Sequence, residues 1–61
     1  MTKRKYTIII RFTTFAEQTK QEEKTYEIEA EDEPLAVARA LLSCEKCYYL
    51  YQVLSVKVTV A

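Results

Sequence analysis

The chain has 61 residues, in which nine Lys and Arg balance nine Asp and Glu, and it contains no histidine, glycine or tryptophan. This length predicts one domain, residues 1–61, in which apolar burial only roughly offsets the entropy lost on folding. We therefore expect unusually good packing or a second chain. Zero net charge disfavours long-range attraction to nucleic acid or an anionic membrane. The missing histidine removes the commonest acid–base group and metal ligand.

Residues 5–14 alternate between apolar and polar positions, which predicts a strand with one buried face. That face carries Tyr6, Ile8, Ile10 and Phe12. Residues 24–30 alternate in the same way and predict a second strand, polar on its outer side. The segment 16–23 between them has helix formers but no glycine, so we expect a long hairpin loop that includes one helical turn.

Asp32, Glu33 and Pro34 mark a helix start, because Asp32 can cap free N–H groups and Pro34 needs no donor in the first turn. The helix is expected over residues 33–46. A helical wheel predicts its core face to consist of Val37, Ala38, Leu41, Cys44 and Tyr48. Leu35 and Leu42 form a second apolar stripe along the flank.

Residues 49–60 predict a third strand, again from alternation. One face carries Leu54, Val56, Val58 and Val60, and the other carries Val53, Ser55, Lys57 and Thr59. A hairpin followed by a right-handed crossover gives an α+β fold of order ββαβ. We expect a three-stranded antiparallel sheet of order 2-1-3 with one helix on one face, which is half of a ferredoxin-like unit.

The third strand leaves a long valine-rich edge with no proline to block pairing. Together with the small core and the extra leucine stripe, this edge predicts a homodimer. The expected interface consists of Leu35, Leu42, Val53, Lys57 and Thr59. The sequence favours a non-enzymatic interaction module or regulator that binds itself and an unidentified protein.

Small RNA- or DNA-binding regulators are the alternative, because basic residues can contact phosphates and tyrosines can stack on bases. The candidate residues are Lys3, Arg4, Lys5, Arg11, Tyr49 and Tyr51. A separate acidic set, Glu27, Glu29 and Glu31, has strand spacing and could bind a basic partner. The competing interpretation is a solvated face whose glutamates pair with Arg11 and Lys57.

Cys44 and Cys47 form the one recognisable short motif. Two thiols at this spacing can act as a redox pair, or can supply half of a zinc site that a second copy would complete. The favoured interpretation is that Cys44 is a core residue and that both thiols stay reduced, with no metal and no cofactor.

No catalytic residue is predicted. The apolar segment after the basic start is interrupted by Arg11 and no stretch is long enough to cross a membrane, so a cytoplasmic protein is expected. The lack of asparagine, with abundant Glu, Lys, Ile and Val, is typical of heat-adapted proteins. Short domains of this kind are frequent in phage and archaeal-virus genomes, which is a statement about such domains in general and not an inference from these residues.

Overall fold

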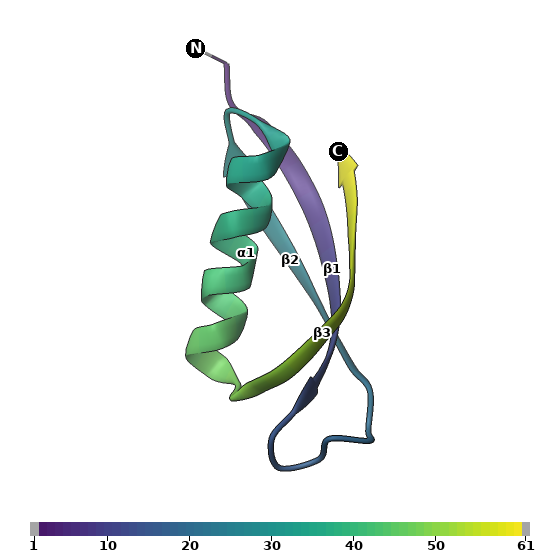
Figure 1. Cartoon of the computed structure of the whole chain (residues 1–61). Coiled ribbons are helices and arrows are strands. Elements are labelled where there is room, and N and C mark those ends of the chain that lie inside the picture. Colours follow the sequence, from purple (N-terminus) through teal and green to yellow (C-terminus); the bar gives the residue numbers. More distant parts are fainter. Residues whose placement is uncertain (1, 61) are drawn as a thin grey trace.

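The computed structural model describes residues 2–60 and contains three strands and one helix. In chain order they are β1 (Arg4–Thr14), β2 (Glu22–Ala30), α1 (Glu33–Cys47) and β3 (Leu50–Val60). The strands form one antiparallel sheet in the order β2-β1-β3, and α1 lies on one side of it (Figure 1). The predicted ββαβ class and strand order are confirmed, with boundaries within two residues.

The connection between β1 and β2 spans residues 15–21 and contains one hydrogen-bonded turn but no helix. The Lys20 N–H donates to the Glu17 carbonyl at 3.2 Å, and the Glu17 N–H donates to Thr14 Oγ1 at 3.3 Å.

The core lies between α1 and the middle of the sheet, on the predicted face of β1. Its buried apolar side chains are Tyr6, Ile8, Ile10, Phe12, Ala30, Ala36, Ala40 and Cys44. At the end of α1, the Tyr48 ring packs against the Phe12 ring with centroids 5.1 Å apart. The aromatic pair therefore closes the core where the helix passes into β3.

Local chemistry fixes both ends of α1. Asp32 Oδ1 accepts a hydrogen bond from the Leu35 N–H at 2.9 Å, and Pro34 occupies the first turn, as the sequence predicts. At the other end the Tyr48 N–H donates to the Cys44 carbonyl at 3.0 Å. Lys46 in the last turn complements the negative end of the helix dipole.

The buried face of α1 differs from the predicted one. Ala36, Ala40 and Cys44 contact the sheet and are fully buried, whereas Ala38, predicted to be in the core, is exposed. Small residues four apart let the helix backbone approach the strands closely, so the larger Val37 and Leu41 lie at the sides and stay half-buried. The helical wheel places the large apolar residues at the centre of the core face, whereas in the structure the small residues occupy that position.

Two irregularities interrupt the predicted alternation of β3. The ladder with β1 shifts register between Arg11 and Phe12 and again between Thr13 and Thr14. The first shift places Val53 opposite Phe12, so Val53 lies on the core side of the sheet rather than on the opposite face. From Ser55 to Val60 the ladder is regular, and the predicted alternation is correct there.

Candidate functional site

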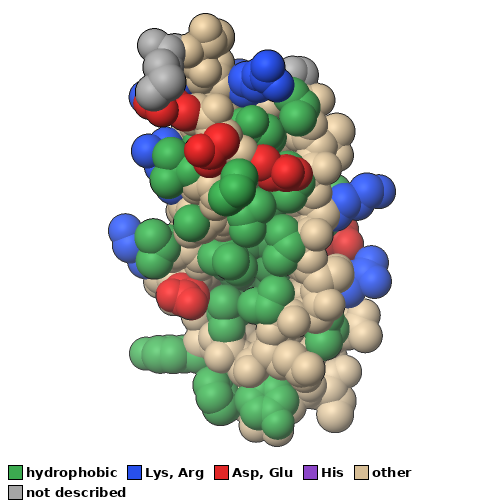
Figure 2. All heavy atoms as spheres, turned by 45° about the horizontal axis from the view of Figure 1, so that its top comes forward, with side chains coloured by type: hydrophobic (Ala, Val, Ile, Leu, Met, Phe, Trp, Pro, Cys, Tyr) green, Lys and Arg blue, Asp and Glu red, His purple; other side chains and the backbone are tan. Residues whose placement is uncertain are grey.

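The most prominent candidate surface is an apolar strip along β3, which we define as Val53, Val56, Val58 and Val60. Their cross-strand partners on β1 are core residues of the helix side, so the strip faces the same side as α1. Val53, Val56 and Val60 nevertheless remain 40%, 37% and 53% exposed. Apolar side chains gather down the centre of the view in Figure 2, with basic groups toward the margins and acidic groups among the apolar ones in the upper part.

The strip is open because one helix cannot cover three strands. The helix lies nearest to β2, and Figure 1 shows the C-terminal part of β3 on the far side of β1 from the helix. Val58 is half-buried, but its neighbours along the strand are exposed. Alternation in the sequence predicts that Val56, Val58 and Val60 share one face of β3. It does not predict that the helix leaves this face uncovered.

The residues predicted for a dimer interface lie on three surfaces. Leu35 and Leu42 are 38% and 59% exposed on the helix, and Val53 belongs to the strip. Lys57 and Thr59 are exposed on the opposite face of β3, beside Ile9 and Thr7. Packing through a single face could not bury all of them, whereas contact along the edge of β3 would include residues from both faces of that strand.

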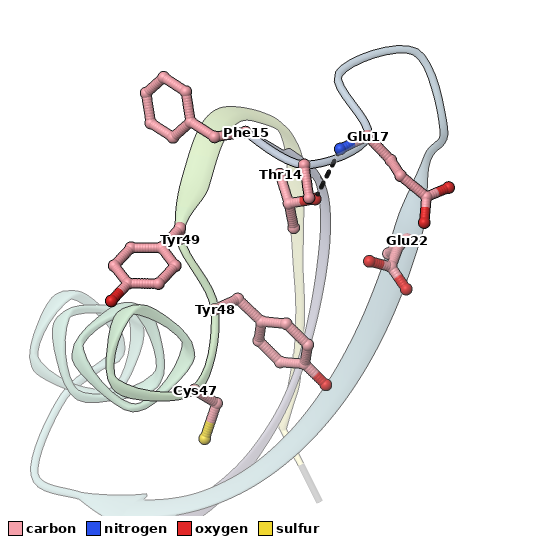
Figure 3. Close-up of a pocket in the computed structure, with 8 residues that line it drawn as sticks. Thr14, Phe15, Glu17, Glu22, Cys47, Tyr48 and Tyr49 are labelled. Carbon is pink, nitrogen blue, oxygen red and sulfur yellow. Dashed lines mark hydrogen bonds between the residues drawn. The ribbon is translucent and has the colours of Figure 1, made fainter.

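A second candidate is a pocket of about 490 Å³ where the hairpin loop meets the end of α1. Its lining consists of Thr14, Phe15, Ala16, Glu17, Glu22, Cys47, Tyr48 and Tyr49. Figure 3 shows the Tyr48 ring between the helix end and β2, with Glu22 on the β2 side. The Phe15 N–H donates to the Tyr49 carbonyl at 3.1 Å and joins the loop to the start of β3.

The pocket offers aromatic surface and carboxylates, but its charges are already partly matched within the chain. Glu17 lies 3.8 Å from the Lys20 ammonium, and Lys24 Nζ lies 5.9 Å from the centre of the Tyr48 ring. Cys47 is exposed at the rim, with no histidine in the chain to activate it as a nucleophile.

The residues predicted for nucleic-acid binding do not come together. Lys3, Arg4 and Lys5 are exposed at the start of β1, next to the end of β2. Tyr49 and Tyr51 lie at the other end of the sheet, where Thr14 pairs with Leu50. Arg11 is nearer to the tyrosines, but its guanidinium forms an ion pair with Glu23 at 3.3 Å.

The acidic set is also divided. Glu27 and Glu29 are exposed on β2 opposite Thr7 and Lys5, but Glu31 follows the last residue of the strand. The predicted pairing of a glutamate with Arg11 occurs at Glu23. The Arg39 guanidinium donates to the Glu29 carbonyl at 2.9 Å and joins α1 to this end of β2.

The two thiols have different surroundings, as their helix positions predict. Cys44 is buried, and this burial raises the pKa of its thiol even though the nearby Tyr26 side chain opposes the shift. Cys47 is exposed. Among residues 2–60, no three Cys, Asp or Glu side chains are grouped closely enough to hold a metal ion.

Comparison with known proteins gives no relative: no family model, no curated protein and no solved structure matches the chain. Within residues 2–60, α1 is too short and too polar to cross a bilayer. The fold and the exposed apolar surface are thus the observations on which a functional conclusion can rest.

Proposed function

We propose that this protein is a non-enzymatic protein-interaction module that acts as a homodimer, with the apolar strip of β3 at the interface. The observation that carries the proposal is the exposure of Val53, Val56 and Val60 on the same side of the sheet as the core. Contiguous apolar surface of this kind marks interaction sites in small soluble domains. Burying it against a partner would add to a core that one helix leaves small.

A second copy is the partner that the strip fits best. An isologous interface places the same patch of both subunits in contact, and a patch of valines is complementary to itself. Lys57, the one charged residue of β3, points to the opposite face, so twofold contact through the strip buries no charge. The zero formal net charge of the chain adds no long-range repulsion between copies.

The test is the mass in solution, measured by light scattering across a dilution series. The proposal expects twice the 7.2 kDa of one chain at micromolar concentration. Val56→Lys should shift the mass to that of a monomer, whereas Thr25→Lys, on the exposed opposite face of β2, should leave the dimer intact. Circular dichroism checks that both variants are folded. A wild-type monomer at micromolar concentration would overturn the proposal.

The nucleic-acid alternative has its own discriminating measurement. Labelled single- and double-stranded oligonucleotides are titrated at low and high salt, because binding through phosphates must weaken steeply as salt rises. The homodimeric module expects no binding at either salt concentration. Salt-sensitive binding that is lost in a Lys3→Ala, Arg4→Ala, Lys5→Ala variant would favour the alternative.

A further inference from the structure

We infer that, if the protein is the homodimer proposed above, the two copies join through the edges of β3. The edges would pair antiparallel about a twofold axis that lies midway between Val58 and Val58 of the second copy. The inference rests on the proposed function and specifies the geometry of its interface. The sheets of the two copies would then form one continuous sheet, with both helices on the same side.

The sheet order leaves two free edges, β2 and β3, and their chemistry differs. The β2 edge is rich in charge, with glutamates on both faces: Glu22, Glu23, Glu27 and Glu29. Two such edges brought together would place carboxylates side by side, which is how natural sheets discourage edge pairing. β3 carries a single charge, Lys57, and has no proline. It is therefore the edge open to a second copy.

The irregular ladder limits which part of β3 can pair. The register shifts lie next to residues 50–54, and bulges of this kind increase twist and disturb the backbone of an edge. Residues 55–60 pair regularly with β1, so their outward backbone groups have the spacing of an ordinary strand. A partner strand would pair with this regular segment.

Side-chain alternation then selects the register. Residues directly opposite one another in an antiparallel ladder share a face, so a twofold axis perpendicular to the sheet must lie midway between a residue and the same residue of the second copy. An axis at Lys57 would set two ammonium groups opposite each other, which is destabilising. An axis at Val56 would extend the pairing into the bulge, and an axis at Thr59 would shorten it.

An axis at Val58 avoids each of these costs. Val58 lies opposite Val58 of the second copy, and Val56 lies opposite its Val60, so the helix side of the joint is made of valine alone. On the other face Lys57 lies opposite Thr59, which separates the two ammonium groups. The same register therefore aligns the strips of both copies across the interface and leaves the charged face exposed.

Cysteine crosslinking tests the register. Val58→Cys and, as the matched control, Lys57→Cys are each made in a Cys47→Ser background, in which Cys44 remains buried. Oxidised glutathione should then crosslink the position-58 variant roughly tenfold faster, because opposite residues fall within disulfide range and diagonal neighbours do not. A nitroxide on position 58 should also show dipolar broadening, and one on Thr25→Cys should show none.

The outcomes separate this inference from the function it rests on. Faster crosslinking of the position-57 variant would overturn the register. A dimeric mass with neither crosslinking nor broadening at position 58 would overturn edge pairing and leave the homodimer standing. A monomeric mass would overturn both. Open-ended polymers would show that β3 pairs with the β2 edge of the next copy, and they would contradict the twofold axis.

Discussion

Tyr26 on β2 and Cys44 on α1 interact across the helix–sheet interface, and the interaction shifts their acidities in opposite directions. Burial is the larger cause in both cases: with the Cys44 side chain adding to it, burial raises the pKa of Tyr26 to about 12. Burial also raises the pKa of the Cys44 thiol, and Tyr26 opposes that rise without cancelling it. Both shifts favour the uncharged form, which is the form that burial at a helix–sheet interface favours.

Stability should fall between pH 10 and pH 12 because of Tyr26. Its pKa is raised from 10.0 to about 12 on folding, so in that window the unfolded chain has released a proton that the folded chain retains. Its contribution is fully present below pH 10 and is lost as the pH rises toward 12. Melting temperatures across this range measure the effect, and Tyr26→Phe should flatten the slope. An equal slope in the variant would contradict the assignment.

The two thiols should react at very different rates. Cys47 is exposed, whereas Cys44 is buried and its pKa is raised, so little reactive thiolate forms at Cys44. A chromogenic thiol reagent at pH 8 should modify one thiol rapidly and the other only after denaturant is added. Cys47→Ser should remove the fast phase. Equal protection of both thiols that a chelator relieved would indicate a shared metal instead.

Close packing of α1 predicts opposite outcomes for two neighbouring alanines. Ala40→Leu should destabilise the fold by about 1–3 kcal/mol, because Ala40 is fully buried against the sheet and a larger side chain overpacks the contact. Ala38→Leu should change stability by less than about 0.5 kcal/mol, since Ala38 is exposed. Urea unfolding measures both. Comparable losses of stability in the two variants would mean that the helix is rotated about its axis and packs a different face on the sheet.

Thr13 provides a site where removing a hydroxyl should help. Its Oγ1 is buried and has no hydrogen-bond partner among residues 2–60, so Thr13→Val should stabilise the protein by about 1 kcal/mol. Thr14→Val is the contrasting variant, because Thr14 Oγ1 accepts a hydrogen bond from the Glu17 N–H at 3.3 Å. Thermal melts should rise for the first variant and fall for the second. A lower melting temperature for Thr13→Val would show that its hydroxyl has a partner.

The N-cap of α1 should contribute about 1 kcal/mol to the free energy of unfolding, the usual effect of an N-cap side chain. Asp32→Ala removes the acceptor of the Leu35 N–H and should lower the free energy of unfolding in urea by that amount. Asp32→Ser should retain most of it, since a hydroxyl can accept the same bond. Glu31→Ala, one residue earlier, controls for the loss of charge.

Patterns local in sequence were enough to predict most of the fold. Asp32 and Pro34 fixed the start of α1, and the alternation around Ile8 and Ile10 identified the central strand. The face of α1 was harder, because a wheel ranks residues by hydrophobicity, whereas the sheet accepts the small Ala36 and Ala40 at its closest approach. That choice depends on the distance between two elements, which no single segment encodes.

The candidate sites depended more strongly on long-range geometry. No glycine marks the bulge that places Val53 on the core side, so the sequence carries no local signal for it. The bulge arises from the pairing of β3 with β1. Lys3 and Tyr51 lie at opposite ends of the sheet because of the direction in which their strands run. The sequence alone grouped them as candidates for one nucleic-acid site. The exposure of Val56 depends on which strands the helix covers.

The pairing of Tyr6 with Val60 has a kinetic consequence. The central strand comes first in the chain, yet one of its two neighbours is the strand made last, so half of the sheet consists of contacts between distant parts of the sequence. Such a topology has a high contact order and predicts slower folding than a helical domain of equal length. During synthesis, β1 and β2 can form a hairpin early, but Ile8 and Ile10 gain their second neighbours only once β3 has left the ribosome.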